Sequence, residues 1–509
     1  MSKIFKTSLL LMVFFGLNKV IALVRQTLIA RQFGFSPEID AFNVANNIPD
    51  LLFSLFSGGA LAMAFIPVFT EHIEKHGKDL SWKLFSKIAN IIFLLTVILA
   101  IIFWLGAQPI VSWKFGISPG FSASQQQLVV ELMRINLIAL IIFSLSGIVM
   151  ASLQAHKHFL LTAIAPILYN VGLIIGAVIF SPHTGITIAG FTLPAFGLGI
   201  YGLVYGTILG ALLHLVIQIP GLIFYKFRWT FSFDFRDPGV QKIMRLMGPR
   251  ILTVFLIQVI FLARDNLASH LIQGSVTTLT YGYFIMQVPE TLIGTAIATA
   301  LLPTLSELVS VEKRHEFIQM VERSLQVIIV STLVITFLLS ITLPQFLDVL
   351  FDFKTSDIAL LTWTTRAYLA GLTAQCVLEV VARAYYAKQN AIVPLVATAL
   401  RTGIFLILSI SFIGAAGAIG LAAADSIAVS VEVIFLLVLL NRMFPLFSAL
   451  KNTFARSLFG SMVSASIVFI IISFFPHLPV FPISLLALLA GIIVYGFFVR
   501  QEIAMVVKL

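Results

Sequence analysis

Charged residues are scarce in this sequence. Of its 509 residues only 11% are Asp, Glu, Lys or Arg, whereas 59% are apolar and the mean hydropathy is +1.05. A water-soluble protein of this length would carry about a quarter of its residues as charged side chains. The composition therefore excludes a soluble globular protein and predicts a polytopic membrane protein.

Cysteine and the short motifs of covalent chemistry are also scarce. The single cysteine, Cys376, lies in an apolar stretch, which excludes an intrachain disulfide and a thiolate zinc site. His72 and His76 have the spacing of a metal-binding pair, but they stand in a hydrophilic segment, where we expect solvation rather than a metal. The sequence has no phosphate-binding Gly-Lys-Ser/Thr loop and no Gly-x-Ser-x-Gly elbow. We therefore expect a transporter without covalent chemistry, metal or cofactor, driven by a coupling ion or by the membrane potential.

Long apolar runs are abundant instead. A helix that crosses a bilayer needs roughly 20 such residues, and runs of this length predict an all-α membrane protein with about fourteen spanning helices. The predicted spans are residues 8–30, 42–70, 84–108, 128–152, 160–180, 198–225, 243–271, 276–304, 323–350, 358–387, 391–412, 417–440, 454–475 and 480–499.

Lys and Arg are distributed asymmetrically around these spans. They concentrate at the two termini and in the even-numbered loops, whereas the odd-numbered loops hold only Lys114 and Lys354. By the positive-inside rule both termini are predicted to be cytoplasmic. The net charge of +10 is then a consequence of topology rather than a sign of nucleic-acid binding.

Proline-containing segments recur in the same order in the two halves of the chain. The sequence Ile66-Pro67-Val68 closes the second span and Leu302-Pro303-Thr304 closes the eighth, and Pro49 and Pro289 precede them. Six spans separate the copies, which predicts two parallel six-helix repeats. We expect an N-terminal lobe at 1–225, a cytoplasmic linker at 226–242, a C-terminal lobe at 243–440 and two added helices at 441–509.

The prolines and nearby glycines are candidate hinges. A proline inside a spanning helix removes a backbone hydrogen bond that hydrocarbon cannot replace, so such breaks usually face protein or a water-filled cavity. A packing kink is the alternative for either helix alone, but matching breaks in both halves favour a gating role. The candidates are Pro49, Gly58, Gly59, Pro289 and Gly294.

Several charged residues fall within predicted spans, where they are costly and tend to line cavities or pair. Lys19 and Arg25 are two cations in the first span, about 120° apart around a straight helix. Arg264 and Asp265 interrupt the seventh span, and Glu290 stands beside the break in the eighth. We expect some of these residues to be structural and others to meet a ligand.

The twelfth span carries two acidic residues on one face. Asp425 and Glu432 are seven residues apart, and Arg401 interrupts the neighbouring eleventh span. The acids together with Glu290 could form a cation or proton site for ion coupling, or they could pair with Arg401. The sequence leaves both possibilities open.

Two further pairs of opposite charge have helical spacing. Glu131 and Arg134 are three residues apart, and Glu379 and Arg383 are four apart. We expect each to form an internal ion pair.

A family resemblance rests on motifs in the first, second and eighth helices. These residues resemble the MurJ (MviN) family, the lipid II flippases of bacterial cell-wall synthesis, which belongs to the multidrug/oligosaccharidyl-lipid/polysaccharide exporter superfamily. The motifs are Asn18-Lys19-Val20, Val24-Arg25, Asp40-Ala41-Phe42, Ile48-Pro49-Asp50-Leu51-Leu52, Gln287-Val288-Pro289 and Leu302-Pro303-Thr304-Leu305-Ser306.

The resemblance implies a specific fold and activity. It implies fourteen helices in two lobes around a cationic cavity, alternating access, and a groove for the lipid tail between the last two helices. Lipid II would move from the cytoplasmic to the outer leaflet of the bacterial inner membrane, with membrane lipids and cell-wall synthesis proteins as partners. Arg25 matches the essential arginine of the family's first helix, Lys19 replaces another, Asp40 matches an acidic residue, and Arg264 is a further candidate to meet the diphosphate.

The sequence also departs from the family pattern. Charged positions of the family are occupied here by Gln26, Phe53, Ser54, Gly58 and Phe284. The chain could therefore be a divergent lipid II flippase or a flippase for another polyprenyl-diphosphate glycan. A multidrug or cation antiporter of the same superfamily and a non-transporting membrane scaffold are the rival hypotheses.

The topology can be tested by chemical labelling. Cysteines introduced at Lys78 and Lys313 should react only with reagents that enter the cytoplasm, and one at Lys354 should react with impermeant reagents from outside. Reversed reactivity at any of these three positions would contradict the predicted orientation.

Overall fold

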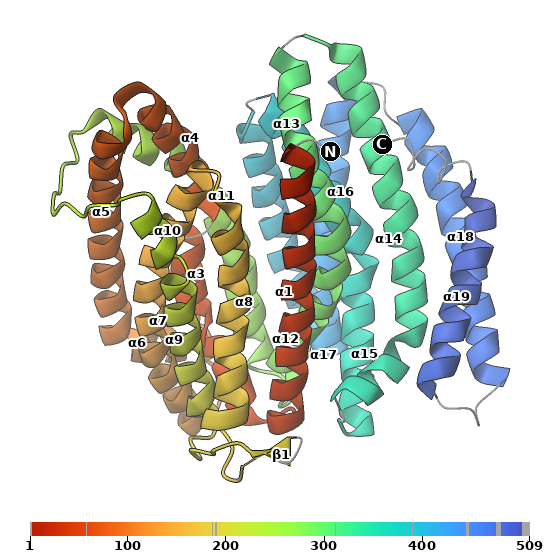
Figure 1. Ribbon diagram of the computed structural model, residues 1–509. Coiled ribbons are helices and arrows are strands. Elements are labelled where there is room, and N and C mark those ends of the chain that lie inside the picture. Colours follow the sequence, from red (N-terminus) through yellow and green to blue (C-terminus); the bar gives the residue numbers. More distant parts are fainter. Residues whose placement is uncertain are drawn as a thin grey trace. The chain divides into compact units, whose positions relative to one another are not determined.

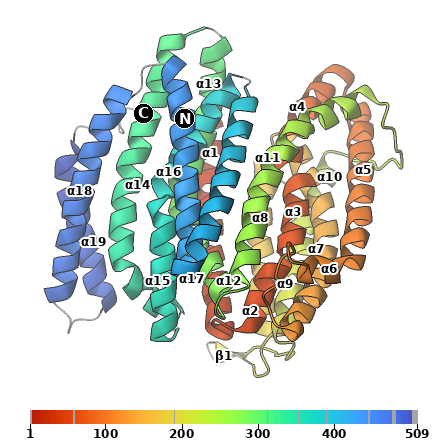
Figure 2. The same ribbon diagram turned by 180° about the vertical axis from the view of Figure 1, so that it is seen from behind.

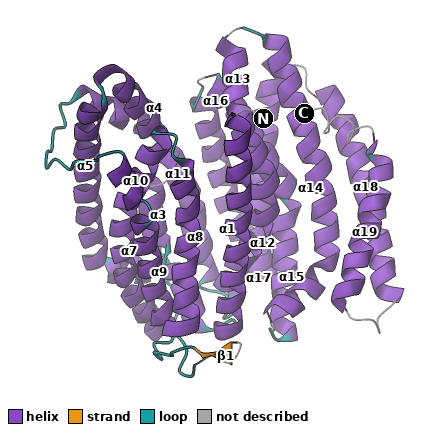
Figure 3. Ribbon diagram, viewed as in Figure 1, coloured by secondary structure: helices purple, strands orange, loops and turns teal. Residues whose placement is uncertain are grey.

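The computed structural model is almost entirely helical (Figures 1 and 3). It describes residues 3–56, 59–185, 187–188, 191–310, 312–351, 353–388, 390–443, 447–474 and 480–500. Two compact units are distinguished, Met1–Val276 and Thr277–Leu509.

The first unit contains most of the short elements. Its strands β1 and β2 have two residues each and pair antiparallel. Its elements are α1 Lys3–Phe33, α2 Pro37–Ala45, α3 Asn47–Phe56, α4 Gly59–His76, α5 Lys78–Leu105, α6 Ala107–Ser112, α7 Ala123–Ala155, α8 Phe159–Ile175, the π-helix η1 Gly176–Phe180, β1 Thr187–Ile188, β2 Phe191–Thr192, α9 Ile200–Val216, α10 Ile219–Phe224 and α11 Pro238–Ala268.

The second unit is built from longer helices, and α12 runs across the boundary between the units. Its elements are α12 Ser275–Pro289, the π-helix η2 Glu290–Thr295, α13 Ala296–Ser310, α14 Arg314–Phe351, α15 Thr355–Ala370, α16 Leu372–Ala387, α17 Ile392–Met443, α18 Phe447–Phe474 and α19 Val480–Phe498. Figures 1 and 2 both show α18 and α19 side by side next to α14.

The predicted all-α membrane fold is confirmed. Within the described residues, ten helices are long and apolar enough to cross a membrane, and a shorter apolar helix covers Ile483–Phe498. Each predicted span falls on a helix or a run of helices. The eleventh and twelfth spans are two helices that meet at Gly417, where the backbone leaves helical geometry with φ 53° and ψ −129°, and the label α17 covers both.

The boundary between the units differs from the predicted lobe boundary. The predicted seventh span, α11, packs against α4 and α3 and belongs to the first unit. In the predicted linker 226–242, Asp234 and Asp237 accept from Lys87 on α5 at 2.9 and 2.8 Å. These contacts hold the segment against the first unit.

Both predicted helix breaks are present. Pro49 lies in the first turn of α3, where its missing N–H is not needed. Pro289 ends α12, and the chain continues as the π-helix η2, a geometry often found at functional sites. Gly294 in η2 is buried, and a Cβ there would lie 2.9 Å from Cα of Cys376. Gly59 begins α4, whereas Gly58 lies outside the described residues.

Small residues allow α8 and α9 to pack closely. Gly172 on α8 faces Gly206 and Gly210 on α9, and Gly176 faces Gly202 and Gly206 one turn further on. A Cβ on Gly172 would lie only 2.3 Å from Cα of Gly210. Between spanning helices, where lipid is as apolar as the side chains, such close backbone contact supplies much of the attraction.

Three helices end with a charged residue in the left-handed conformation. Lys157 after α7, Lys226 after α10 and Glu312 after α13 have φ values of 60°, 56° and 56°. At each end the next amide N–H donates to a carbonyl five residues earlier, which is the Schellman arrangement usually closed by glycine. Each non-glycine residue is strained there by roughly 1–2 kcal/mol.

The glycine contact between α8 and α9 makes a stability prediction. Gly172→Ala should force the helices apart and lower the free energy of unfolding by about 1–3 kcal/mol. Gly403→Ala is the matched control, because a Cβ at Gly403 on α17 meets nothing within 4 Å. Thermal unfolding of both variants in detergent measures the difference, and equal midpoints would contradict the close-contact interpretation.

Candidate functional site

The first-helix arginine lies in a network of amides. Arg25 on α1 is half-buried, and its Nη1 donates to Oδ1 of Asn170 on α8 at 2.8 Å. Nδ2 of Asn170 donates in turn to Oδ1 of Asn18 at 2.9 Å and to the carbonyl of Pro166 at 3.1 Å. The amide side chain of Asn170 is thereby fixed at both ends, and it sets the direction of the guanidinium.

Two other residues of the first unit lie near this network. Tyr169, next to Asn170 on α8, is within electrostatic range of both Arg25 and Asp50. Asp50 is exposed on α3, and Lys19 is half-buried on α1. The predicted cations Lys19 and Arg25 are thus accompanied by an acid and a phenol that sequence reasoning did not assign to the site.

Arg264 is placed differently from the expectation of a ligand-facing cation. Its Nε donates to Oδ1 of Asp265 at 2.7 Å, and its guanidinium lies 5.2 Å from the centre of the Phe261 ring. Asp265 also accepts from Nδ2 of Asn47 on α3 at 2.9 Å. Arg264 and Asp265 are both buried, so this arginine is part of an internal ion pair that joins α11 to α3.

Asp40 is likewise an internal residue. It is only 2% exposed, and its Oδ2 accepts from the backbone N–H of Gly274 at 2.7 Å. Gly274 has a φ of +85°, and a Cβ there would lie 2.7 Å from Phe35. The carboxylate therefore holds a tight turn before α12, and its role as a candidate substrate contact stays a prediction.

Neutral contacts occupy the positions at which the family carries charge. Ser54 accepts from Nε2 of Gln258 at 3.0 Å, and the Phe53 ring lies 5.3 Å from that of Phe143. Gln26 is buried and Phe284 is half-buried. The α3 surface of the first unit is thus polar or aromatic at these positions, without added cations.

The acidic residue beside the second helix break has hydroxyl partners. Glu290 in η2 accepts from Oγ1 of Thr295 at 3.0 Å and from Oγ1 of Thr291 at 3.2 Å. Both threonines lie in the π-helix that also contains Glu290. The π-helical backbone therefore positions the two hydroxyls that hold the carboxylate.

The second unit contains a buried cluster of three charged residues on α17. Nη2 of Arg401 donates to Oδ1 of Asp425 at 2.9 Å, and Nη1 lies 3.5 Å from Oε2 of Glu432. Glu432 also accepts from Oγ1 of Thr398 at 2.9 Å. The three charged residues are between 2% and 7% exposed.

This cluster depends on the bend in α17. Residues 401 and 425 would lie roughly 36 Å apart along a straight helix, at 1.5 Å per residue. Their 2.9 Å contact shows that the two arms of α17 fold back on each other at Gly417. Of the two possibilities left open by the sequence, the structure shows the pairing with Arg401.

The two predicted ion pairs at helical spacing differ in outcome. Nη2 of Arg383 lies 3.1 Å from Oε2 of Glu379, as predicted. Glu131 instead accepts from the hydroxyl of Tyr201 and from Gln127, while Nε of Arg134 donates to the carbonyl of Trp104. The Glu131–Arg134 prediction was wrong because each side chain has a nearer partner on another helix or one turn away.

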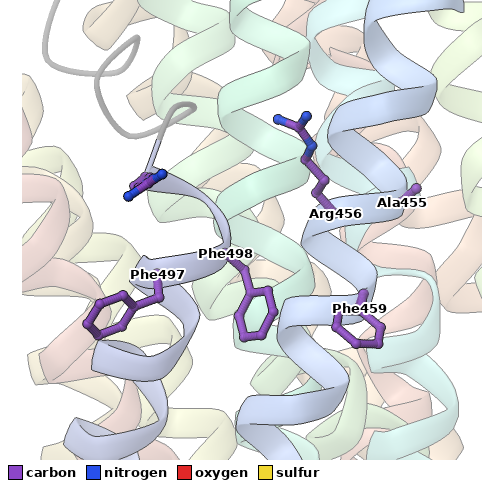
Figure 4. A pocket seen from close by; sticks show the side chains of 6 residues that line it. Ala455, Arg456, Phe459, Phe497 and Phe498 are labelled. Atoms are coloured by element: carbon purple, nitrogen blue, oxygen red, sulfur yellow. The ribbon is translucent and has the colours of Figure 1, made fainter.

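The last two helices carry a pocket near one end (Figure 4). Its volume is about 560 Å³, and it combines arginine with aromatic side chains. The lining residues are Ala455, Arg456, Phe459, Phe497, Phe498 and Arg500. The pair is joined to α14 by a hydrogen bond from the Tyr495 hydroxyl to the carbonyl of Val330 at 2.6 Å.

Comparison with known proteins identifies one family across most of the chain. The family model described as "Lipid II flippase MurJ" matches residues 29–491. The protein named "Lipid II flippase MurJ" from Burkholderia cenocepacia is 30% identical over 383 residues, covering 74% of this chain and 71% of the relative. The "Probable lipid II flippase MurJ" from Vibrio cholerae is 28% identical and covers 81% of this chain and 78% of the relative.

Solved structures agree on the fold. A structure described as "Lipid II flippase MurJ, inward closed conformation" aligns with a TM-score of 0.77 at 23% identity, covering 97% of this chain and all of that chain. An inward-facing multidrug resistance MATE family transporter of the MOP superfamily aligns with a TM-score of 0.69 at 15% identity, covering 86% of this chain and 96% of that one. Because the family model spans nearly the whole sequence, this multi-pass membrane protein belongs to the MurJ family of lipid II flippases.

Proposed function

We propose that the protein moves lipid II from the cytoplasmic to the outer leaflet of the bacterial inner membrane. The observation that carries this proposal is the half-buried guanidinium of Arg25 on α1, which Asn170 orients, in a chain that the family model matches over residues 29–491. A guanidinium offers a planar fork of donors that suits phosphate oxygens. Lys19 adds a second cation on the same helix.

Transport requires binding and release rather than bond chemistry. The anionic diphosphate would contact Arg25 and Lys19, while the lipid tail remains in the surrounding lipid. Alternating access would then expose the headgroup on the opposite face, and the breaks at Pro49 and Pro289 are the candidate hinges. The protein's own residues would bind, orient and release the headgroup, with no covalent intermediate.

The antiporter hypothesis is less consistent with the acidic residues. A site for cationic drugs needs carboxylates that can face the drug. Asp425 and Glu432 instead face Arg401, and Glu290 is engaged by two threonine hydroxyls. These three carboxylates thus have internal partners, which favours an anionic substrate.

Other polyprenyl-diphosphate glycans remain the alternative cargo. They share the diphosphate that Arg25 would recognise, and they differ in the sugar. Ser54 and Gln258 form a neutral hydrogen-bonded pair at a position where the family carries arginine. Binding of purified lipid II, measured by native mass spectrometry, tests the cargo directly and separates a flippase from an antiporter or a scaffold.

The orientation and the partners belong to the same proposal. The distribution of Lys and Arg supports cytoplasmic termini. Cell-wall synthesis proteins would receive the translocated precursor on the outer face.

The charged cluster on α17 is the proposed coupling element. With both carboxylates ionised, Asp425 and Glu432 would exceed the single charge of Arg401 by one negative charge in a buried site. Burial of that excess is unfavourable, so a proton or a monovalent cation would neutralise it. An ion gradient could therefore bias the equilibrium between transport states through Glu432, which is the more distant of the two carboxylates from Arg401.

Substitution of Arg25 tests the anion site. Arg25→Ala removes charge-assisted hydrogen bonds worth about 1.5–3 kcal/mol, so lipid II affinity should fall roughly 10- to 100-fold. Arg25→Lys should lose less, and Lys19→Ala should be milder still because a lysine side chain can also extend toward the interface. Lipid II binding and complementation of a flippase-depleted strain, at equal expression, measure these effects.

A gain of charge provides the control for this test. Phe53→Arg adds a cation at a position where the family carries one, so it should be tolerated or increase affinity for the diphosphate. A site built for cationic drugs would be weakened by the same change. Transport that persists in Arg25→Ala would overturn the role of this arginine.

Substitution of Glu432 tests the coupling element. Glu432→Gln keeps the Arg401–Asp425 contact and removes the excess carboxylate, so the fold should persist while the response of flipping to an imposed proton or sodium gradient is lost. Arg401→Gln should destabilise the protein by about 3–5 kcal/mol, because it leaves buried carboxylates without a cation. Flipping in proteoliposomes with imposed gradients is the measurement, and an unchanged gradient response in Glu432→Gln would rule out coupling through this residue.

A further inference from the structure

A second basic pocket lies within the second unit, at the ends of four of its helices. It is formed where α13 gives way to α14 (Figure 1) and where α16 and α17 end. Its volume of about 570 Å³ falls within the range of roughly 300–1,000 Å³ that is typical of ligand pockets. The lining residues are Leu308, Val309, Glu312, Arg314, Phe317, Lys388 and Arg442.

Three cations from three helix ends line this pocket. Arg314 begins α14, Lys388 follows α16, and Arg442 is near the end of α17. Glu312 is the carboxylate among the lining residues, so the lining carries a formal excess of two positive charges. The positive-inside rule explains why cations occupy this face of the membrane, but it does not require them to line one pocket.

The electrostatic environment of Lys388 supports this arrangement. Burial lowers the pKa of the Lys388 ammonium, and the nearby charge of Arg314 lowers it further. The half-buried ammonium of Lys388 therefore lies within electrostatic range of the like charge of Arg314, which is exposed. A bound anion would offset this repulsion.

The turn that forms one wall of the pocket is strained. Glu312 has a φ of 56°, which a side chain other than glycine rarely adopts, yet its N–H donates to the carbonyl of Val309 at 3.2 Å. The N–H of Lys313 donates to the carbonyl of Leu308 at 3.0 Å. The same Schellman arrangement ends α7 and α10, and here it places the side chain of Glu312 in the lining of the pocket.

The other part of the lining is apolar. Leu308 and Phe317 are buried, and Val309 is half-buried. A small soluble anion would contact only the cations, whereas an amphiphile could use both parts of the lining. Basic pockets between helices at the cytoplasmic side of a membrane are suited to anionic lipid headgroups.

We propose that this pocket binds the phosphate headgroup of an anionic membrane lipid in the cytoplasmic leaflet. Arg314, Lys388 and Arg442 would contact the phosphate oxygens, and Leu308 and Phe317 would contact the adjoining glycerol and acyl carbons. The location follows the predicted topology, and the inference is independent of which glycan lipid the protein transports. Bound lipid would hold the ends of α14, α16 and α17 together at this face of the second unit.

Lipid titration of the full chain in detergent tests the proposal. Native mass spectrometry counts the lipid molecules bound to each protein molecule. The first molecule of phosphatidylglycerol should bind to the wild-type protein with higher affinity than the first molecule of phosphatidylcholine. Lys388→Gln and Arg314→Gln should each weaken this first binding event by about tenfold. Glu312→Gln, which keeps the strained turn but removes the carboxylate, should strengthen it.

Lys313→Gln is the matched control. Lys313 is exposed, adjoins Arg314 in sequence, and pairs with Glu316 at 2.9 Å without lining the pocket. Its substitution should leave the first binding event unchanged. Equal weakening by Lys313→Gln would indicate attraction to the basic surface in general and overturn the site.

A soluble competitor distinguishes the source of the phosphate. Pyrophosphate at the same concentration should not displace phosphatidylglycerol from the wild-type protein. Displacement would assign the pocket to a soluble anion and overturn the lipid proposal. A further outcome is that lipid II displaces phosphatidylglycerol in a manner that depends on Lys388 and Arg314. That outcome would assign the pocket to the transported cargo and would also overturn the lipid proposal.

Discussion

A charged side chain that is placed inside a bilayer must find its partner within the protein, and much of this structure depends on how that requirement is met. Water is absent from hydrocarbon, so an uncompensated charge is unfavourable by several kcal/mol. The cluster of Arg401, Asp425 and Glu432 meets the requirement within one bent helix. Arg264 and Asp265 meet it between adjacent residues. Each solution fixes the chain locally, because loss of one partner leaves the other buried.

Arg25 has a different kind of hydrogen-bond partner. Its guanidinium donates to the neutral amide of Asn170, which itself is fixed by Asn18 and by the Pro166 carbonyl. An amide orients a cation without cancelling its charge, whereas a carboxylate would do both. Arg25 thus has a neutral amide among its partners, whereas Arg264 has a carboxylate. This difference is the physical basis for the proposal that Arg25 rather than Arg264 meets the anionic headgroup.

The sequence alone predicts the membrane spans, but it does not predict most of the side-chain contacts between helices. Hydropathy and proline breaks are local properties, so the helices and the break after Pro289 could be anticipated from runs of neighbouring residues, whereas the π-helical geometry of that break could not. The sequence offered the pairing of Asp425 with Arg401 as one of two possibilities, and the packing of the two arms of α17 was needed to choose between them. Asn170 lies 145 positions from Arg25 in the sequence, so its role could not be seen before the packing of α1 on α8 was known.

Contacts between distant positions also surround residues that the sequence singled out. Asp40, a candidate substrate contact by resemblance, accepts from the N–H of Gly274, 234 positions away. The predicted lobes follow the repeat in the sequence, whereas the compact units follow packing, which groups α11 with α3 and α4.

The neutral contacts on α3 bear on how a diphosphate can still be bound. Ser54 and Gln258 are mutually hydrogen-bonded where additional cations would have raised the positive potential. Fewer cations lower the affinity for an anion in both transport states, and they also lower the cost of releasing it. Transport depends on the difference in affinity between states rather than on its absolute value. A chain with fewer fixed cations can therefore remain a transporter provided that its affinity for the headgroup differs between the two states, and in the proposed function Arg25 is the cation whose access would change.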